Sequence, residues 1–280
     1  MISVRSTAKI NLTLKVTGTR QDGYHLLDSL FCAIDLHDLL TLEPVPSGFE
    51  TICLTGEQIP RNLTTRAAQL FYQATGQPGG CRIGLDKRIP MEAGLGGGSG
   101  DAAAVLRALN EHFGAPLSPD ALSVLAVGLG ADVPFALTGG LARITGIGEC
   151  RRPLPGLPPV FFVLAKPSAG LSTQQMFAAY DAAPPCLPID NDAFCRALYA
   201  LDATGLRAHG GNDLQPAAER CLPIISVLQN RLYEQGALYA AMTGSGSAVF
   251  GLFTDRAQAQ SACQAMQVLV PFCVVCQSVG

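Results

Sequence analysis

The sequence has no tryptophan, few other aromatic residues and few charges, and these shortages exclude several classes of protein. Only 6% of its 280 residues are aromatic and 15% are charged, while 48% are hydrophobic. A chain this apolar and this poor in charge can bury a sizeable core, so an intrinsically disordered protein is excluded. The length suits one large domain or two modest ones.

Positive charge is also scarce. The chain has 19 Lys and Arg against 22 Asp and Glu, which gives a net charge of −3. A protein that binds nucleic acid through the phosphate backbone needs a basic face to do so. We therefore expect no nucleic-acid partner.

Long apolar runs are absent as well. The longest are short, such as residues 160–165, and a membrane-spanning helix needs about 18 to 20 residues. The N-terminus lacks the basic start and unbroken apolar block of a secretion signal. We therefore expect a soluble cytoplasmic protein, a monomer or weak homodimer, with no membrane partner.

The ten cysteines do not form a recognisable framework. Their share lies well below the ~8–10% that is typical of a disulfide scaffold. Only Cys273 and Cys276 have C-x-x-C spacing, and a zinc site of four ligands would need a second close pair. Both lie in residues 268–276, which have the pattern of a buried strand. We interpret them as structural thiols in a reducing compartment.

Extended and helical patterns alternate along the whole chain. The alternation of apolar residues predicts strands at 3–17, 24–40, 51–54, 81–85, 160–165, 238–242, 248–253 and near the C-terminus. Helical spacing and capping signals predict helices at 62–75, 101–113, 118–128, 172–182, 191–201, 217–235 and 256–268.

A proline-dense stretch, residues 152–159, is the best candidate for a linker. We place a domain boundary near residue 155, which gives domains at 1–155 and 156–280. Strands precede and follow helices in both halves, which favours two layers of α+β structure.

The strongest chemical signal is a glycine-rich segment that begins at Pro90 and leads into a predicted helix. Five of the seven residues from Gly94 to Gly100 are glycine. Such a backbone can approach a ligand closely and adopt positive φ angles. The free amides and positive dipole end of the following helix would face the same ligand, and a phosphate is the natural occupant. The alternative is a tight connecting turn without a ligand.

Known phosphate and nucleophile motifs do not fit this segment. No Gly-Lys dipeptide occurs anywhere in the chain, so it is not a Walker loop. Ser99 stands where the third glycine of G-x-G-x-x-G would be, and Asp101 stands where G-x-S-x-G would need its second glycine. The loop therefore binds phosphate by another scheme, in which Ser99 could offer its hydroxyl to phosphate or metal.

A second glycine turn, residues 242–247, lies between two predicted strands. Alone it is a weak signal, because most such turns are only structural. Together with the first loop it could close over the other side of a phosphate chain.

Residues 90–104 resemble the P-x-x-x-G-L-G-[GS]-G-S signature of the GHMP small-molecule kinases, which act on galactose, homoserine, mevalonate and phosphomevalonate. The resemblance implies an α+β fold of two domains, an N-terminal ribosomal-S5-domain-2-like domain and a C-terminal ferredoxin-like domain. It also implies ATP as phosphate donor and Mg²⁺ held mostly by phosphates and water.

Four further segments resemble one branch of that family: residues 8–12, 22–25, 129–135 and 243–246. This branch phosphorylates the 2-hydroxyl of 4-diphosphocytidyl-2-C-methyl-D-erythritol, a cytidine diphosphate-linked small molecule, in the non-mevalonate isoprenoid pathway. The alternatives are another GHMP kinase with a mevalonate, homoserine or sugar acceptor, and a non-catalytic ATP-binding sensor on the same fold.

The resemblance implies two catalytic residues. Asp132 matches the general base that removes the proton of the substrate hydroxyl, and Lys9 matches a lysine beside it. A cation there would favour the ionised carboxylate and help to stabilise charge on the γ-phosphate. Without the family, Asp132 reads as a turn or cap residue and Lys9 as a solvent-facing position of a strand.

The resemblance also implies two sets of binding residues. Those expected to hold ATP are Asn62, Leu63, Lys87, Pro90, Gly94, Leu95, Gly96, Gly97, Gly98, Ser99 and Gly100. Those expected to bind the cytidine-linked substrate are Asn11, Tyr24, His25, Thr173 and Phe177. The chain departs from the family at Gly100, where a second serine is common, and we expect the loop to survive that change.

Overall fold

The computed structural model describes residues 1–54, 62–185 and 187–279. Contacts divide the chain into two compact units built from non-contiguous segments. Unit 1 comprises residues 1–9, 36–89 and 96–139, and unit 2 comprises residues 10–35, 90–95 and 140–280. The division reflects two long strands, β1 (Ile2–Thr19) and β2 (His25–Val45), each of which contributes one half to each unit. A single boundary near residue 155 does not describe these units and stays a prediction about the sequence.

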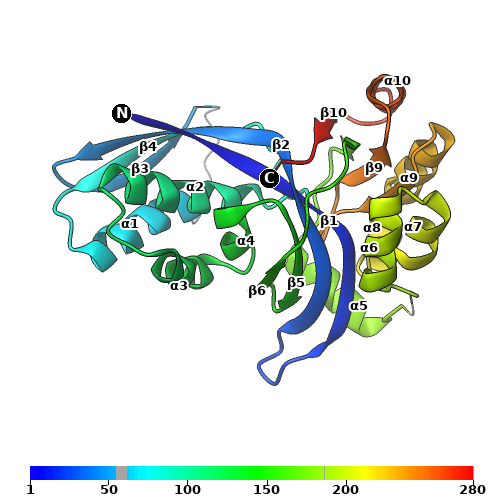
Figure 1. Cartoon of the computed structure of the whole chain (residues 1–280), viewed down its shortest axis with the longest axis horizontal. Helices are drawn as coiled ribbons and strands as arrows, with labels where there is room; N and C mark the ends of the chain where they lie inside the picture. Colours follow the sequence, from blue (N-terminus) through cyan, green and yellow to red (C-terminus); the bar gives the residue numbers. More distant parts are fainter. Residues whose placement is uncertain (55–61, 186, 280) are drawn as a thin grey trace. The chain divides into compact units, whose positions relative to one another are not determined.

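Unit 1 combines strands with a layer of helices. The second half of β2 pairs antiparallel with β4 (Gly80–Asp86), which pairs parallel with β3 (Phe49–Cys53). Its helices are α1 (Leu63–Thr75), α2 (Gly97–His112), α3 (Pro119–Leu129) and α4 (Val133–Thr138). In Figure 1, α1 packs on β3 and β4, and α2 contacts the three other helices.

The middle of α2, from Gly100 to Leu106, is buried. Ala102, Ala103 and Ala104 have no exposed surface, and they join the apolar residues of β2, β4 and α1 in one core cluster. Small side chains allow helices to approach closely, so the alanine run explains how α2 fits in the middle of this unit. The glycine-rich segment at its N-terminus is therefore held by a rigid element.

Unit 2 contains an antiparallel sheet in the order β10-β7-β9-β8. The strands are β7 (Phe161–Lys166), β8 (Tyr239–Met242), β9 (Val249–Phe253) and β10 (Phe272–Gln277). Helices α9 (Ile224–Glu234) and α10 (Arg256–Met266) pack on this sheet, as Figure 1 shows. Four antiparallel strands with packed helices agree with the α+β class expected for this half.

Among the described residues, unit 2 also contains the second half of β1, the first half of β2 and six further elements. Strand β5 (Leu141–Gly146) pairs antiparallel with β2 and with β6 (Cys150–Pro153). The other helices are α5 (Thr173–Ala182), α6 (Asn191–Ala200), α7 (Ala203–His209) and α8 (Gln215–Cys221).

Three predicted elements differ from the structure. The helix predicted at 101–113 begins at Gly97, so the second half of the glycine-rich segment is helical. The helix predicted at 217–235 is two helices, α8 and α9, because Pro223 cannot continue a helix from its N-terminal side. The strand predicted at 268–276 begins only at Phe272, and Val268 is exposed. The short elements α4, α7, β5 and β6 were not predicted.

The cysteines of the described residues carry free thiols. Cys273 and Cys276 are buried on β10, in the core position expected for structural thiols. Within the described ranges, no group of three or more His, Cys, Asp or Glu side chains is arranged to hold a metal ion.

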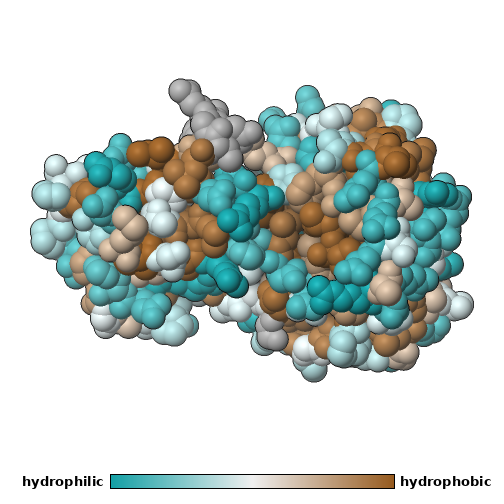
Figure 2. All heavy atoms as spheres, turned by 90° about the horizontal axis from the view of Figure 1, so that it is seen from above, coloured by the Kyte–Doolittle hydropathy of each residue, from teal (hydrophilic) through white to brown (hydrophobic). Residues whose placement is uncertain are grey.

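The surface mixes polar residues with smaller apolar patches, as the face drawn in Figure 2 shows. Isolated apolar side chains such as Val124 and Val127 on α3 are exposed, which is common in globular proteins. Among the described residues, no helix has the length and the apolar composition to cross a membrane.

Candidate phosphate-transfer site

The glycine-rich segment supplies unpaired backbone amides at a helix N-terminus. Gly96 is the N-cap of α2 and has a φ of 68°, a conformation that favours glycine. The first intrahelical hydrogen bond runs from the Gly100 amide to the Gly96 carbonyl over 2.8 Å. The amides of Gly97, Gly98 and Ser99 therefore precede the hydrogen-bonded ladder of the helix. This arrangement suits an anion such as a phosphate.

Lys9 and Asp132 meet beside this segment, in unit 1. Lys9 Nζ lies 3.4 Å from Asp132 Oδ2, and the side chains are 8% and 32% exposed, respectively. A Cβ atom on Gly96 would stand only 3.0 Å from Lys9 Cγ, so the stem of Lys9 passes directly under the glycine. The two predicted catalytic residues and Gly96 therefore form one cluster.

Asp132 is the N-cap of α4, but its side chain makes no capping hydrogen bond. A partly exposed carboxylate that is not used as a cap remains available to a substrate hydroxyl. Lys9, in contrast, is buried, which contradicts the solvent-facing position suggested by the strand pattern alone. A buried lysine next to a carboxylate is a common feature of functional sites.

Lys87 lies behind the glycine-rich segment as part of a buried ion network. Its Nζ is 2.5 Å from Asp38 Oδ2 and 3.0 Å from Asp101 Oδ2. Burial alone would lower the pKa of Lys87, but the two carboxylates outweigh burial and raise it. Lys87 is therefore a buried, paired cation, and its expected part in holding ATP stays a prediction.

Asp101 is the unusual member of the network. Burial is the main cause that raises the pKa of Asp101 to about 7. The Lys87 ammonium and the Ser6 hydroxyl lower this pKa, and the Asp38 carboxylate raises it. Two carboxylates that share one buried ammonium do not both ionise easily. Asp101 therefore exchanges its proton close to neutral pH.

Replacing Asp101 by Asn is expected to flatten the pH dependence of stability between about pH 4 and pH 8. The folded-state pKa of about 7 lies above the ordinary 3.8, so the folded chain binds the proton more tightly. This stabilisation is complete below about pH 4 and is lost as the pH rises through 7, at a cost of the order of a few kcal/mol. Urea unfolding of the wild-type protein and of Asp101→Asn at pH 5 and pH 8 measures this loss of stability. If both proteins lose the same stability between these values, the assignment is wrong.

Asn62 and Leu63, which are predicted to hold ATP, are the N-cap and the first residue of α1. Asn62 Oδ1 caps this helix by accepting a hydrogen bond from the Thr64 amide over 2.9 Å. Leu63 is half-buried and packs against the core of unit 1. Both have local structural roles, and their contact with a base stays a prediction.

The second glycine turn contacts the start of the first glycine-rich segment within unit 2. Thr243 Oγ1 donates to the Gly94 carbonyl over 3.2 Å and accepts from the Asn11 amide over 2.9 Å. A Cβ on Gly94 would stand 2.1 Å from the Thr243 carbonyl oxygen, which only glycine permits. The two glycine turns therefore meet at Gly94, and their closing over a phosphate chain stays a prediction, as do the roles of Pro90 and Leu95.

The predicted substrate residues of unit 2 fall into two groups. Asn11 is buried, and its amide group donates to Ser29 Oγ over 3.0 Å. Thr173, at the start of α5, shares a hydrogen bond of 2.8 Å with Ser245 of the second glycine turn. Asn11 and Thr173 thus both connect to that turn.

His25 and Phe177 form the second group. Their rings stack with centroids 4.5 Å apart, and His25 Nε2 lies 2.7 Å from Asp181 Oδ1. Tyr24 is 60% exposed. The structure therefore brings His25, rather than Tyr24, against Phe177.

Sequence reasoning missed four polar residues at the site: Ser6, Asp38, Asp101 and Asp181. Asp101 was read only as the first acid of a helix, and Asp38 and Ser6 lie in strands whose partners are distant in the sequence. Each of these three is at most 2% exposed. No local signal singles out Asp38, because β2 also contains Asp28, Asp35 and His37.

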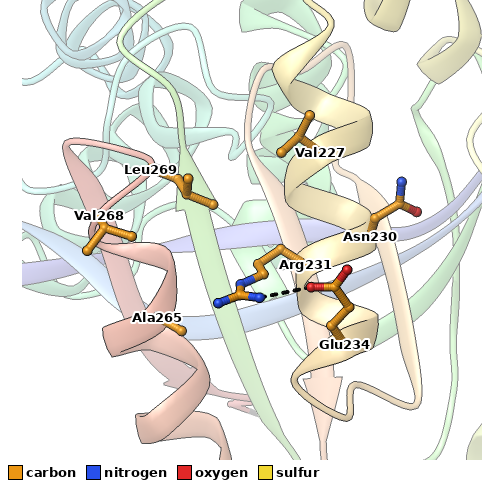
Figure 3. Close-up of a pocket in the computed structure, with 7 residues that line it drawn as sticks. All are labelled: Val227, Asn230, Arg231, Glu234, Ala265, Val268 and Leu269. Carbon is orange, nitrogen blue, oxygen red and sulfur yellow. Dashed lines mark hydrogen bonds and ion pairs between the residues drawn. The ribbon is translucent and has the colours of Figure 1, made fainter.

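A separate pocket of about 350 Å³ lies between α9 and the end of α10. Figure 3 shows Arg231 and Glu234 paired along one wall, opposite Val268 and Leu269. None of the predicted site residues lines it. Most residues that line this pocket are apolar or belong to the Arg231–Glu234 ion pair. We therefore base the candidate site on the glycine-rich segment.

Comparisons with known proteins identify the family of the chain. Residues 62–140 match the GHMP kinases N-terminal domain and residues 190–268 the GHMP kinases C-terminal domain. A 4-diphosphocytidyl-2-C-methyl-D-erythritol kinase of Pelotomaculum thermopropionicum is 42% identical over 263 residues, which cover 93% of this chain and 92% of the relative.

Two solved structures have the same fold. A crystal structure of 4-(cytidine 5'-diphospho)-2C-methyl-D-erythritol kinase has a TM-score of 0.83 and 39% identity, with 100% of both chains covered. A homoserine kinase from Cytophaga hutchinsonii has a TM-score of 0.78 at 20% identity, covering 99% of this chain and 94% of its own, and shares the fold alone. The chain therefore belongs to the GHMP kinases and, within them, to the 4-diphosphocytidyl-2-C-methyl-D-erythritol kinase family.

Proposed function

We propose that this chain transfers the γ-phosphate of ATP to the 2-hydroxyl of 4-diphosphocytidyl-2-C-methyl-D-erythritol, in the non-mevalonate route to isoprenoid precursors. The observation that carries the proposal is the cluster of Lys9, Asp132 and Gly96 in unit 1. It places an available carboxylate and an ammonium next to free helix-terminal amides. Phosphoryl transfer needs mainly this alignment and charge stabilisation.

Each residue has a definite part in the proposed reaction. The amides at the start of α2 hold the phosphates of ATP, and Asp132 accepts the proton of the attacking hydroxyl. Lys9 offsets negative charge on Asp132 and on the transferred group. Mg²⁺ would enter with ATP, where phosphate oxygens and water would hold it, and it would offset charge on the phosphates.

The cytidine end of the acceptor is proposed to bind at His25 and Phe177. An aromatic face can stack on a pyrimidine, and Nδ1 of His25, the ring nitrogen that Asp181 does not contact, can read its edge. Asp181 supports this assignment because a carboxylate on Nε2 fixes the orientation of the imidazole. Asn11 and Thr173 are proposed to contact the rest of the acceptor. We further propose a cytoplasmic monomer or weak homodimer.

A coupled ADP-release assay over a small panel of acceptors tests the function. We expect turnover with 4-diphosphocytidyl-2-C-methyl-D-erythritol and none above background with mevalonate or homoserine. CMP should compete with the acceptor, because the proposed pocket recognises the base. Turnover with mevalonate or homoserine, without competition by CMP, would assign the chain to another GHMP kinase activity. ATP binding without ADP release from any acceptor would indicate a sensor.

A further inference from the structure

Three charged side chains from three elements meet behind the first turn of α2. They are Asp38 of β2, Lys87 of the turn after β4, and Asp101 of α2, and their side chains are 0%, 8% and 3% exposed. Burying three charges costs more free energy than burying apolar residues of similar size, even when the charges pair. A network at this place therefore calls for a role beyond stability.

The network reaches the glycine-rich segment directly. A Cβ on Gly97 would stand 3.2 Å from Lys87 Nζ and 3.0 Å from Ile89 Cγ2, so the ammonium lies immediately beneath the start of α2. Asp38 Oδ1 accepts hydrogen bonds from the backbone amides of Arg88 over 2.5 Å and of Ile89 over 2.7 Å. The Asp38 carboxylate thus fixes the turn at Arg88 and Ile89, which leads toward the glycine-rich segment. Lys87 links this carboxylate to Asp101 of α2.

The opposite side of the first turn is equally constrained. A Cβ on Gly100 would stand 2.7 Å from Ser6 Oγ and 2.9 Å from the Thr7 carbonyl oxygen, so no side chain fits there. Ser6 Oγ and Asp101 Oδ1 are both buried on this side of the turn. The turn is therefore enclosed by β1 on one side and by Lys87 on the other.

We propose that Lys87 is a positioning residue for phosphate binding. Its buried ammonium ties Asp101 of α2 to Asp38 of β2 and so holds the first-turn amides in the orientation that a nucleotide phosphate requires. The proposal rests on the proposed function only in taking ATP as the ligand.

A purely structural role makes a different prediction. If Lys87 only balances two buried carboxylates, removing all three charges together should restore both stability and nucleotide binding. If Lys87 orients the first-turn amides through its two ion pairs, stability should return while nucleotide binding stays weak. A variant in which all three side chains are neutral therefore distinguishes the structural role of Lys87 from the positioning role.

The test compares Lys87→Met with the triple variant Asp38→Asn/Lys87→Met/Asp101→Asn. The amide oxygen of an asparagine at position 38 can still accept the two turn amides. We expect Lys87→Met to lower Tm and to weaken MgATP binding, measured by calorimetry, at least about tenfold. The triple variant should regain most of the lost Tm but keep the weakened Kd.

Arg107→Met provides the matched control on the same helix. Arg107 is a largely buried cation of α2 that donates to the carbonyls of Ala136 and Leu137, away from the first turn. It should lower Tm and leave the Kd for MgATP within about twofold. A wild-type Kd in the triple variant, or an equal loss of affinity in Arg107→Met, overturns the proposal. Because calorimetry needs no acceptor, a failed acceptor assignment does not affect this result.

Discussion

Asp132→Asn should lower kcat by about 10²–10⁴-fold while the fold stays intact, since that is the usual contribution of a general base. The amide is isosteric with the carboxyl group, and the side chain is 32% exposed and makes no capping bond whose loss would unfold α4. ADP release at saturating substrates measures kcat, and thermal unfolding checks the fold. The KM for ATP should change little, because the base acts on the acceptor hydroxyl.

Asp120→Asn is a matched control for this variant. Asp120 is an exposed carboxyl group in the first turn of α3, in the same unit. Its replacement should leave kcat unchanged within about twofold, as expected for a surface substitution away from the site. If Asp132→Asn keeps more than about a tenth of the wild-type kcat, Asp132 is not the base.

The contrast between Lys9 and the glycine-rich segment shows what the sequence could reveal. Glycine density and an abrupt helix start are local features, so a phosphate loop could be predicted without knowing the fold. The position of Lys9 could not, because an alternating strand normally has one solvent-facing side. In the structure, residues 8–14 of β1 are all buried, and the polar positions Lys9, Asn11 and Thr13 face other polar groups.

The network of Lys87 illustrates a second limit. Lys87 follows a strand in a charged stretch, where a solvated side chain is the ordinary expectation. Its partners Asp38 and Asp101 are 49 and 14 residues away in the sequence. Only the pairing of β2 with β4 and the placement of α2 bring them together. Contacts of this kind depend on tertiary structure, and no local pattern contains them.

Helix boundaries were predicted where local chemistry sets them. Ser118 caps α3 through its side chain, and Pro119 follows at the first helical position, as the sequence indicated. The start of α2 was placed four residues late, because glycines are poor helix formers by propensity. Packing of the alanine-rich part of α2 in the core outweighs that propensity, so the helix extends back to Gly97.

Gly98→Val should weaken MgATP binding at least about tenfold and change Tm by less than about 2 °C. Helix geometry puts Gly97 and Gly100 on the inner side of α2, where a Cβ would meet Ile89 or Ser6. A Cβ on Gly98, in contrast, meets no atom of the described residues within 4 Å. The added side chain therefore costs little in the free protein, but it occupies the space in front of the first-turn amides. Calorimetry gives the Kd, and thermal unfolding gives the Tm.

Gly128→Val separates this effect from a general effect of valine in a helix. Gly128 lies in α3, and a Cβ there also meets nothing within 4 Å among the described residues. It should leave both Tm and Kd close to wild type. A Gly98→Val protein that binds MgATP normally would mean that the nucleotide does not approach this face of α2, whatever acceptor the enzyme uses. Normal stability with weak binding in Gly98→Val alone would place the phosphates at the start of α2, next to Lys9 and Asp132.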